Sequence, residues 1–316
     1  MRPFDLTSPT SVEAALASSG TFLAGGTTLV DLMKLNVMTP DHVVDINALP
    51  LRGIDTSDGL RIGALERMSD VARHPGVYPA ISRALLLSAS QQLRNMASIG
   101  GNLLQRTRCG YFRDVAMSCN KREPGSGCPA ISGANRTHAV LGTSDSCVAT
   151  HASDVAVALV ALGAELRLAS TAERRTVRLV DFYRLPGDTP DIENDLQPGE
   201  LITEVVVPRL DWAWRSTYVK VRDRQSYEFA TCSVAVALDV RGSRIADARV
   251  AAGGVATTPW RLTSVEAALV GAAVTTEAFE EASTVAAEGA RPLSGNAFKV
   301  PLLKRTIVRA LIEASR

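Results

Sequence analysis

The chain has 316 residues, of which 46% are hydrophobic and 21% charged, and its formal net charge at pH 7 is +1. This length allows two or three domains with buried cores, and the near-zero charge provides no general attraction to nucleic acid or to an anionic membrane. No apolar run is long enough for a transmembrane helix.

The first half of the chain is predicted to mix short helices and short strands. The N-terminus MRPFDLTSPT has no apolar signal core, so we expect a cytoplasmic chain, or a periplasmic one exported with a signal-bearing partner. The pattern then predicts helices near 8–20, 29–36, 69–74, 79–90 and 153–163, strands at 21–24 and 42–46, and hairpins at 51–65 and 164–183, followed by a strand at 201–208. Between these elements, residues 105–150 lack apolar periodicity, which is long for an unstructured loop and indicates a functional segment.

The second half has a different pattern. Segments 216–223, 229–240 and 243–255 alternate apolar and polar residues and predict a three-stranded antiparallel sheet. Helices are then predicted at 264–272, 275–290 and 300–315. A block of strands followed by a block of helices indicates an α+β fold and a separate domain, with its boundary near 209–215.

Two Gly-Gly turns are candidate anion-binding sites. LAGGTTL (23–29) and SIGGNLL (98–104) each place two glycines after a small or apolar residue and before Thr or Asn. Glycine allows backbone amides to converge on phosphate oxygens. The spacing is not that of a dinucleotide-binding Rossmann motif, and ordinary structural turns remain an alternative.

Three segments in this order resemble a known family. FLAGGTTLVDLMK, ASIGGNL and SDVAVALVALGAELRL are similar to the FAD-binding subunit of the xanthine dehydrogenase and aldehyde oxidase class of molybdenum hydroxylases. The resemblance implies a PCMH-type FAD-binding domain of two α+β subdomains over residues 1–210. It also implies a C-terminal flavoprotein domain over residues 211–316, in which a three-stranded antiparallel sheet carries three helices.

The resemblance also implies which residues hold FAD. Both turns would cradle the pyrophosphate, Asp154 would lie near the cofactor, and Lys220 would approach the isoalloxazine. A helix cap and a solvated strand residue are the structural alternatives for these two. With Arg108, the implied FAD-binding residues are Leu23, Ala24, Gly25, Gly26, Thr27, Thr28, Leu29, Val30, Ser98, Ile99, Gly100, Gly101, Asn102, Leu103, Asp154 and Lys220.

Four of the five cysteines lie within or beside RTRCGYFRDVAMSCNKREPGSGC. Cys109, Cys119, Cys128 and Cys147 follow the spacing C-x9-C-x8-C-x18-C, and the segment is rich in Arg, Lys and Gly. Structural zinc sites usually contain closer cysteine pairs, and disulfides would not explain the basic residues. Unpaired thiols are normally buried, which is not expected in so polar a segment. An iron–sulfur cluster, whose negative charge needs hydrogen bonds or cations, suits the segment, although spacing alone leaves zinc and unpaired thiols open.

The family resemblance favours the cluster. The same segment is similar to the insertion in the flavin subunit of bacterial periplasmic aldehyde oxidoreductases, which implies that all four cysteines bind a [4Fe–4S] cluster. Basic residues of the segment, among them Arg106, Arg113 and Lys121, are expected to offset its charge. Cys232, in an alternating segment, is expected to be a core residue.

We therefore expect an electron-transfer subunit with FAD and a [4Fe–4S] cluster in a heterotrimeric aldehyde oxidoreductase. Molybdopterin would be on a large partner subunit and [2Fe–2S] clusters on a small one, with electrons passing to an external acceptor. No residue of this chain is assigned a catalytic role, and no nucleic-acid module or membrane span is expected. The alternatives are the flavin subunit of a xanthine or other N-heterocycle dehydrogenase, a stand-alone FAD oxidoreductase, and a zinc-stabilised binding module.

Overall fold

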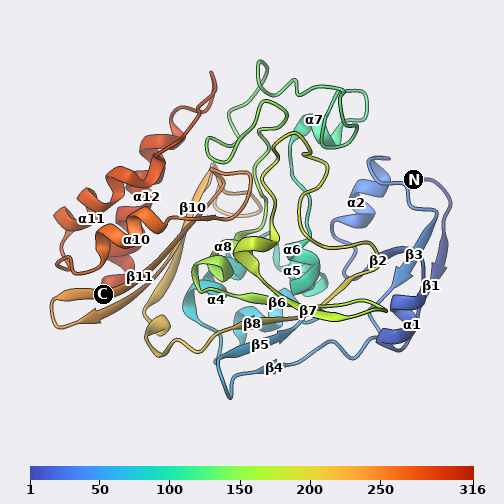
Figure 1. Cartoon of the computed structure of the whole chain (residues 1–316), viewed down its shortest axis with the longest axis horizontal. Coiled ribbons are helices and arrows are strands. Elements are labelled where there is room, and N and C mark those ends of the chain that lie inside the picture. Colours follow the sequence, from blue (N-terminus) through green and yellow to red (C-terminus); the bar gives the residue numbers. More distant parts are fainter.

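Figure 1 shows three β-sheets that follow one another along the molecule in chain order, in a computed structural model that describes all of residues 1–316. A long irregular segment, mostly green in the figure, lies over one side of this row of sheets. None of the helices combines the length and the apolar character needed to cross a membrane.

The N-terminal sheet is parallel and has the order β1-β3-β2. Its strands and helices are β1 (Asp5–Thr7), α1 (Val12–Ala17), β2 (Thr21–Leu23), α2 (Leu29–Lys34) and β3 (His42–Asp45). Ser11 begins α1, because its side chain accepts a hydrogen bond from the amide of Ala14 at 3.2 Å. In this sheet, β2 leads directly into the first glycine turn and α2.

The middle sheet is antiparallel and has the order β4-β5-β8-β6-β7. Its strands are β4 (Ile54–Asp55), β5 (Leu60–Gly63), β6 (Glu165–Ala169), β7 (Arg174–Arg178) and β8 (Leu201–Val207). The helices packed around it are α3 (Met68–Arg73), α4 (Pro79–Leu86), α5 (Gln91–Met96), α6 (Ile99–Leu103), α8 (Asp154–Ala161) and α9 (Leu179–Phe182). Both hairpins predicted from the sequence are present.

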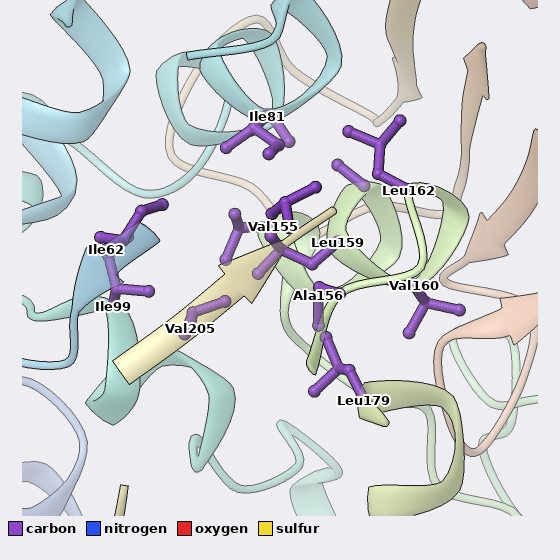
Figure 2. Close-up of a cluster of buried hydrophobic side chains, with 14 of the residues drawn as sticks. Ile62, Ile81, Ile99, Val155, Ala156, Leu159, Val160, Leu162, Leu179 and Val205 are labelled. Atoms are coloured by element: carbon purple, nitrogen blue, oxygen red, sulfur yellow. The ribbon is translucent and has the colours of Figure 1, made fainter. Parts of the chain in front are cut away.

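Helix α8 is the centre of the largest core. All eight of its residues are buried, as expected for the almost wholly apolar sequence DVAVALVA. Figure 2 shows Val155 and Leu159 of this helix between Ile81 of α4 and Val205 of β8. The opposite side of α8 contacts the C-terminal sheet, so one helix joins the two halves of the chain.

The C-terminal sheet is antiparallel and has four strands in the order β12-β11-β10-β9. Its elements are η1 (Asp211–Trp214), β9 (Ser216–Val221), β10 (Cys232–Arg241), β11 (Arg244–Gly253), β12 (Trp260–Arg261), α10 (Thr263–Leu269), α11 (Thr276–Ser283), η2 (Thr284–Ala287) and α12 (Lys299–Ser315). The α+β fold class is confirmed, but the predicted three strands are corrected to four. The two-residue β12 is too short to give an alternating pattern.

The segment 105–150 contains one short helix, α7 (Gly110–Arg113), and otherwise no helix or extended strand. We call this segment the insertion. Figure 1 shows it above the middle of the molecule, between α2 and the C-terminal helices. The predicted domain boundary near 210 falls on the link between β8 and β9 and stays a prediction.

Candidate functional site

The first glycine turn presents free backbone donors. None of the amides of residues 25–28 donates a hydrogen bond within the chain. Gly26 has φ +71°, a conformation that side chains other than glycine rarely adopt. A Cβ on Gly25 would lie 2.0 Å from the carbonyl oxygen of Met96, so only glycine fits this close approach. Adjacent unsatisfied amides of this kind are suited to binding an anion.

The second turn is built differently. Its amides are already bonded: Gly100 donates to the carbonyl oxygen of Ala64 at 2.8 Å, and Gly101 donates to Oγ of Ser98 at 3.2 Å. A Cβ on Gly101 would lie 3.9 Å from the Cβ of Ala24 in the first turn. The second turn therefore lies close to the first and shapes the site between them, whereas the first turn provides the free hydrogen-bond donors.

Both turns border one cavity of about 720 Å³. This volume lies within the range of small-molecule and cofactor sites. Of the predicted FAD-binding residues, those lining the cavity are Ala24, Gly25, Gly26, Thr27, Thr28, Leu29, Ser98, Gly100 and Gly101. The cavity brings together two sequence segments that are about seventy positions apart, as predicted.

Five other predicted residues of the two turns do not line this cavity: Leu23, Val30, Ile99, Asn102 and Leu103. Ile99 and Leu103 are buried in the core. The Oδ1 of Asn102 accepts a 2.6 Å hydrogen bond from Oγ of Ser153, the residue that caps α8. Ile99, Asn102 and Leu103 therefore anchor the second turn to the core and to the start of α8.

The far wall of the cavity was not predicted from the sequence. It is formed by Arg106, Arg184 and much of the segment 191–202. In this wall, the guanidinium of Arg106 and the ammonium of Lys121 both contact the carboxylate of Glu193, the latter at 2.9 Å. Burial opposes ionisation of Glu193, but Lys121 and then Arg106 outweigh it and lower the pKa of the carboxyl.

Asp154 and Lys220 form one buried network. The ammonium of Lys220 lies 2.7 Å from Oδ2 of Asp154, and the hydroxyl of Tyr218 donates to Oδ1 at 2.6 Å. Burial, followed by the charge of Asp154, raises the pKa of Tyr218, so its hydroxyl stays protonated and can donate. Lys220 is therefore not a solvated strand residue, and it lies behind Asp154 rather than on a cavity surface.

Arg108 and Asp154 line a second cavity of about 30 Å³. Two buried polar atoms here have no hydrogen-bond partner, Nε of Arg108 and Oγ of Ser233. Buried polar groups are normally bonded, so these atoms suit a polar ligand group. His151 lines both this cavity and a third one, which we call the intermediate cavity and which shares Leu104 and Glu193 with the large cavity. The intermediate cavity therefore links the small cavity to the large one.

All four predicted cysteine ligands line a single narrow cavity within the insertion, namely Cys109, Cys119, Cys128 and Cys147. All are free thiols. Burial raises the pKa of Cys109 to about 11 and raises those of Cys128 and Cys147. Nearby amides, such as those of Tyr111 and Phe112 at Cys109, partly oppose this effect. Coordinating metal would shift these thiols to the thiolate form.

The basic residues of the insertion are mostly committed to other partners. Arg108 and Arg113 bind the carboxylate of Asp31 in α2, at 3.0 and 2.7 Å. Arg122 donates to backbone carbonyls within the insertion. Of the expected cations, Lys121 alone lines the cysteine cavity. The expectation that these cations offset the charge of a cluster stays a prediction, with Lys121 nearest to the thiols, whereas most of the arginines fasten the insertion to the rest of the chain.

The cysteine cavity is connected to the large one through the intermediate cavity. Lys121 and Cys147 line both the cysteine cavity and the intermediate cavity, which shares Glu193 with the large cavity. Cys232 is elsewhere, fully buried in β10, as predicted for a core residue. No three His, Cys, Asp or Glu side chains are grouped as the ligands of a single metal ion would be.

Two sequence families match the chain. Residues 2–210 match the FAD binding domain in molybdopterin dehydrogenase, and residues 217–314 match the CO dehydrogenase flavoprotein C-terminal domain. These matches confirm the resemblance found in the turns and in α8.

Individual relatives extend over most of the chain. The aldehyde oxidoreductase FAD-binding subunit PaoB of Escherichia coli is 47% identical over 315 residues, which is 96% of each chain. The glyceraldehyde dehydrogenase medium chain of Sulfolobus acidocaldarius is 33% identical over 79% of this chain and 73% of its own. The solved carbon monoxide dehydrogenase of Hydrogenophaga pseudoflava has a TM-score of 0.75 at 28% identity, covering 99% of this chain and 98% of that one. The chain belongs to the FAD-binding subunits of the molybdenum hydroxylase family and is a flavoprotein component of an oxidoreductase.

Proposed function

We propose that this chain is the FAD and [4Fe–4S] subunit of a molybdenum-dependent aldehyde oxidoreductase. Its partners would be a large molybdopterin-binding subunit and a small [2Fe–2S] subunit, and electrons would leave for an external acceptor. The observation that carries the proposal is that two glycine turns border one cavity, four cysteines border another, and a third cavity shares lining residues with both.

The residues around the large cavity fit FAD. The free amides of residues 25–28 would bind the pyrophosphate, and the close second turn would shape the site around it. Arg108 and Ser233 would bond polar atoms of the cofactor in the adjoining small cavity. Lys220 would fix the position of the Asp154 carboxylate there through their 2.7 Å contact.

The residues around the cysteine cavity fit a cluster better than a zinc ion. Four thiols line one cavity, yet no three metal-binding side chains are grouped around a single point. A zinc ion needs four ligands at one centre, whereas in a [4Fe–4S] cluster the four cysteines are distributed over a larger core. Lys121 and the backbone amides beside the sulfurs would offset part of the negative charge.

The chemistry divides between the subunits. Bound FAD exchanges electrons one or two at a time, and an iron–sulfur cluster exchanges them singly. The residues of this chain bind and orient these groups, and none needs to act as an acid or base on the substrate. The aldehyde assignment rests on the 47% identical relative. An N-heterocyclic substrate is the alternative, since the nicotine 6-hydroxylase medium subunit of Paenarthrobacter nicotinovorans is 25% identical.

Analysis of the complex purified from its host tests the proposal. We expect flavin absorbance near about 450 nm, a broad iron–sulfur shoulder bleached by dithionite, and about four iron and four sulfide per copy of this chain beyond those of the small subunit. Turnover of aldehydes but not N-heterocycles would support the substrate class. A zinc-containing, colourless chain would contradict the proposal, and so would substrate turnover by this chain without partners.

Replacement of Gly26 by Val tests the first turn. The side chain would enter a turn whose φ of +71° and cavity position favour glycine, and we expect flavin content to fall severalfold. Gly242→Val is the matched control, because Gly242 has φ +61° but an added Cβ meets nothing within 4 Å. Equal flavin content in both variants would show that the turn is only structural.

A further inference from the structure

One histidine of the insertion lies against a predicted cluster ligand. His138 is 4% exposed and lines the cysteine cavity together with the four thiols. Its Nε2 is 3.2 Å from Sγ of Cys109. Its other ring nitrogen, Nδ1, is buried and has no hydrogen-bond partner. The sulfur is therefore the side-chain atom to which this buried ring is hydrogen-bonded.

We propose that His138 donates a hydrogen bond from Nε2 to the sulfur of Cys109 and thereby raises the reduction potential of the cluster. This inference rests on the proposed presence of a [4Fe–4S] cluster. His138 would be a positioning and tuning residue rather than a ligand, since the four cysteines of the cavity suffice for the four irons.

The direction of the hydrogen bond follows from the chemistry of the two atoms. An iron-bound thiolate has no proton and can only accept, so the ring must carry its proton on Nε2. Reduction adds negative charge to the cluster and its sulfurs. A donor to one sulfur stabilises the reduced form more than the oxidised form.

The backbone that carries the ring is held by the C-terminal domain. The carbonyl of His138 accepts from Nδ2 of Asn296 at 3.2 Å, and the ammonium of Lys299 donates to the carbonyl of Thr137 at 3.0 Å. The amide of His138 donates to the carbonyl of Asn135 at 3.0 Å. Because both neighbouring backbone groups are fixed, the imidazole has little freedom to leave Cys109. Such outer contacts orient metal ligands and tune the metal.

Two substitutions in the assembled complex test the inference. In His138→Leu the donor is lost at similar bulk, and we expect the midpoint potential of the cluster to become more negative with about four irons retained. In His138→Gln the terminal amide can donate from nearly the same place, and we expect the potential to return toward that of the wild type. The potentials would be measured by redox titration followed by electron paramagnetic resonance.

Iron and sulfide analysis of the same samples separates the outcomes. Equal potentials in all three proteins, with full iron content, would overturn the role of His138. Loss of one iron in both variants would also overturn it, because His138 would then be a ligand. A wild-type chain without iron would instead overturn the proposed function, and this inference with it.

Discussion

The C-terminal domain and the insertion are stabilised by different interactions. A single cluster of 24 buried hydrophobic residues holds the C-terminal sheet to its helices. The corresponding cluster at the insertion has three members, Leu32, Phe112 and Cys119, and Leu32 belongs to α2. Only the end of the insertion joins the larger core, through Val140 and Leu141.

Polar contacts replace the missing apolar core. Arg108 and Arg113 bind Asp31 at one side of the insertion, and Lys121 and Arg106 bind Glu193 at the other. Partly exposed ion pairs contribute little each. A segment of this length with so small a core therefore needs a further constraint, and a metal cluster bound by four of its side chains would provide one.

Replacement of a proposed cluster ligand is expected to have the largest effect on the insertion and little effect on the C-terminal domain. In Cys119→Ser the thiolate is replaced by a poorer iron ligand, and we expect the iron content to fall from about four atoms per chain. The insertion should then be cleaved severalfold faster in limited proteolysis, while the C-terminal domain is not. Mass spectrometry of the cleavage sites and iron analysis measure both effects.

Cys232→Ala is the control within the C-terminal domain. Cys232 is fully buried in β10, and the small cavity created should cost about 1 kcal/mol of unfolding free energy. The iron content should be unchanged. If iron remained in Cys119→Ser, or left in Cys232→Ala, the assignment of the ligands would be wrong.

The same contrast explains what could be predicted from the sequence. Strands β9, β10 and β11 were found because larger apolar residues alternate with small or polar ones along each, although β9 and β10 are buried on both faces for most of their length. The two-residue β12 leaves no such pattern. The Gly-Gly motif of the first turn predicted amides able to bind an anion, and the amides of this turn donate no hydrogen bond within the chain. The wall at 191–202 was missed because its residues face the cavity without any repeating pattern.

Contacts between side chains that are far apart in the sequence could not be predicted from such patterns. The position of Lys220 at the flavin stays a prediction, but its contact with Asp154, 66 positions earlier, could not be read from the sequence. The arginines of the insertion were expected to offset the charge of a cluster, and the sequence did not indicate that three of them form ion pairs with Asp31 and Glu193. In both cases the residue type was informative, whereas its partner is decided by tertiary packing.

A smaller effect is expected at the wall between the cavities. In Glu193→Gln the negative charge shared by Lys121 and Arg106 is removed, and the side chain of Lys121 is only 10% exposed. Leaving these cations unpaired should cost about 2 kcal/mol of unfolding free energy, measured by denaturant unfolding of the complex-free chain. Both cofactor contents should also fall, because Glu193 lines the large cavity and its partner Lys121 lines the cysteine cavity.

Asp145→Asn is the matched control, since the pair between Asp145 and Arg291 is largely exposed, with side-chain exposures of 91% and 64%. Its loss should cost less than about 1 kcal/mol. Equal effects of the two substitutions would mean that the wall at Glu193 is no more than another surface contact.

The smallest effect is the loss of stability of the insertion at acidic pH, which depends on the charges of its ion pairs. The pKa of Asp31 is lowered chiefly by its hydrogen bond with Arg113, and that of Glu193 is lowered by Lys121 and Arg106 despite burial. A carboxyl whose pKa is lower in the folded state stabilises it above the ordinary pKa and loses this contribution as the pH falls through the folded value. Between pH 5 and pH 3, amide exchange corrected for intrinsic rates should therefore rise first in the insertion, while the apolar C-terminal core stays protected. In a variant with both Asp31→Asn and Glu193→Gln, this difference should be absent. Simultaneous loss of protection in the insertion and in the C-terminal core of the wild type would show that the insertion does not depend on these ion pairs.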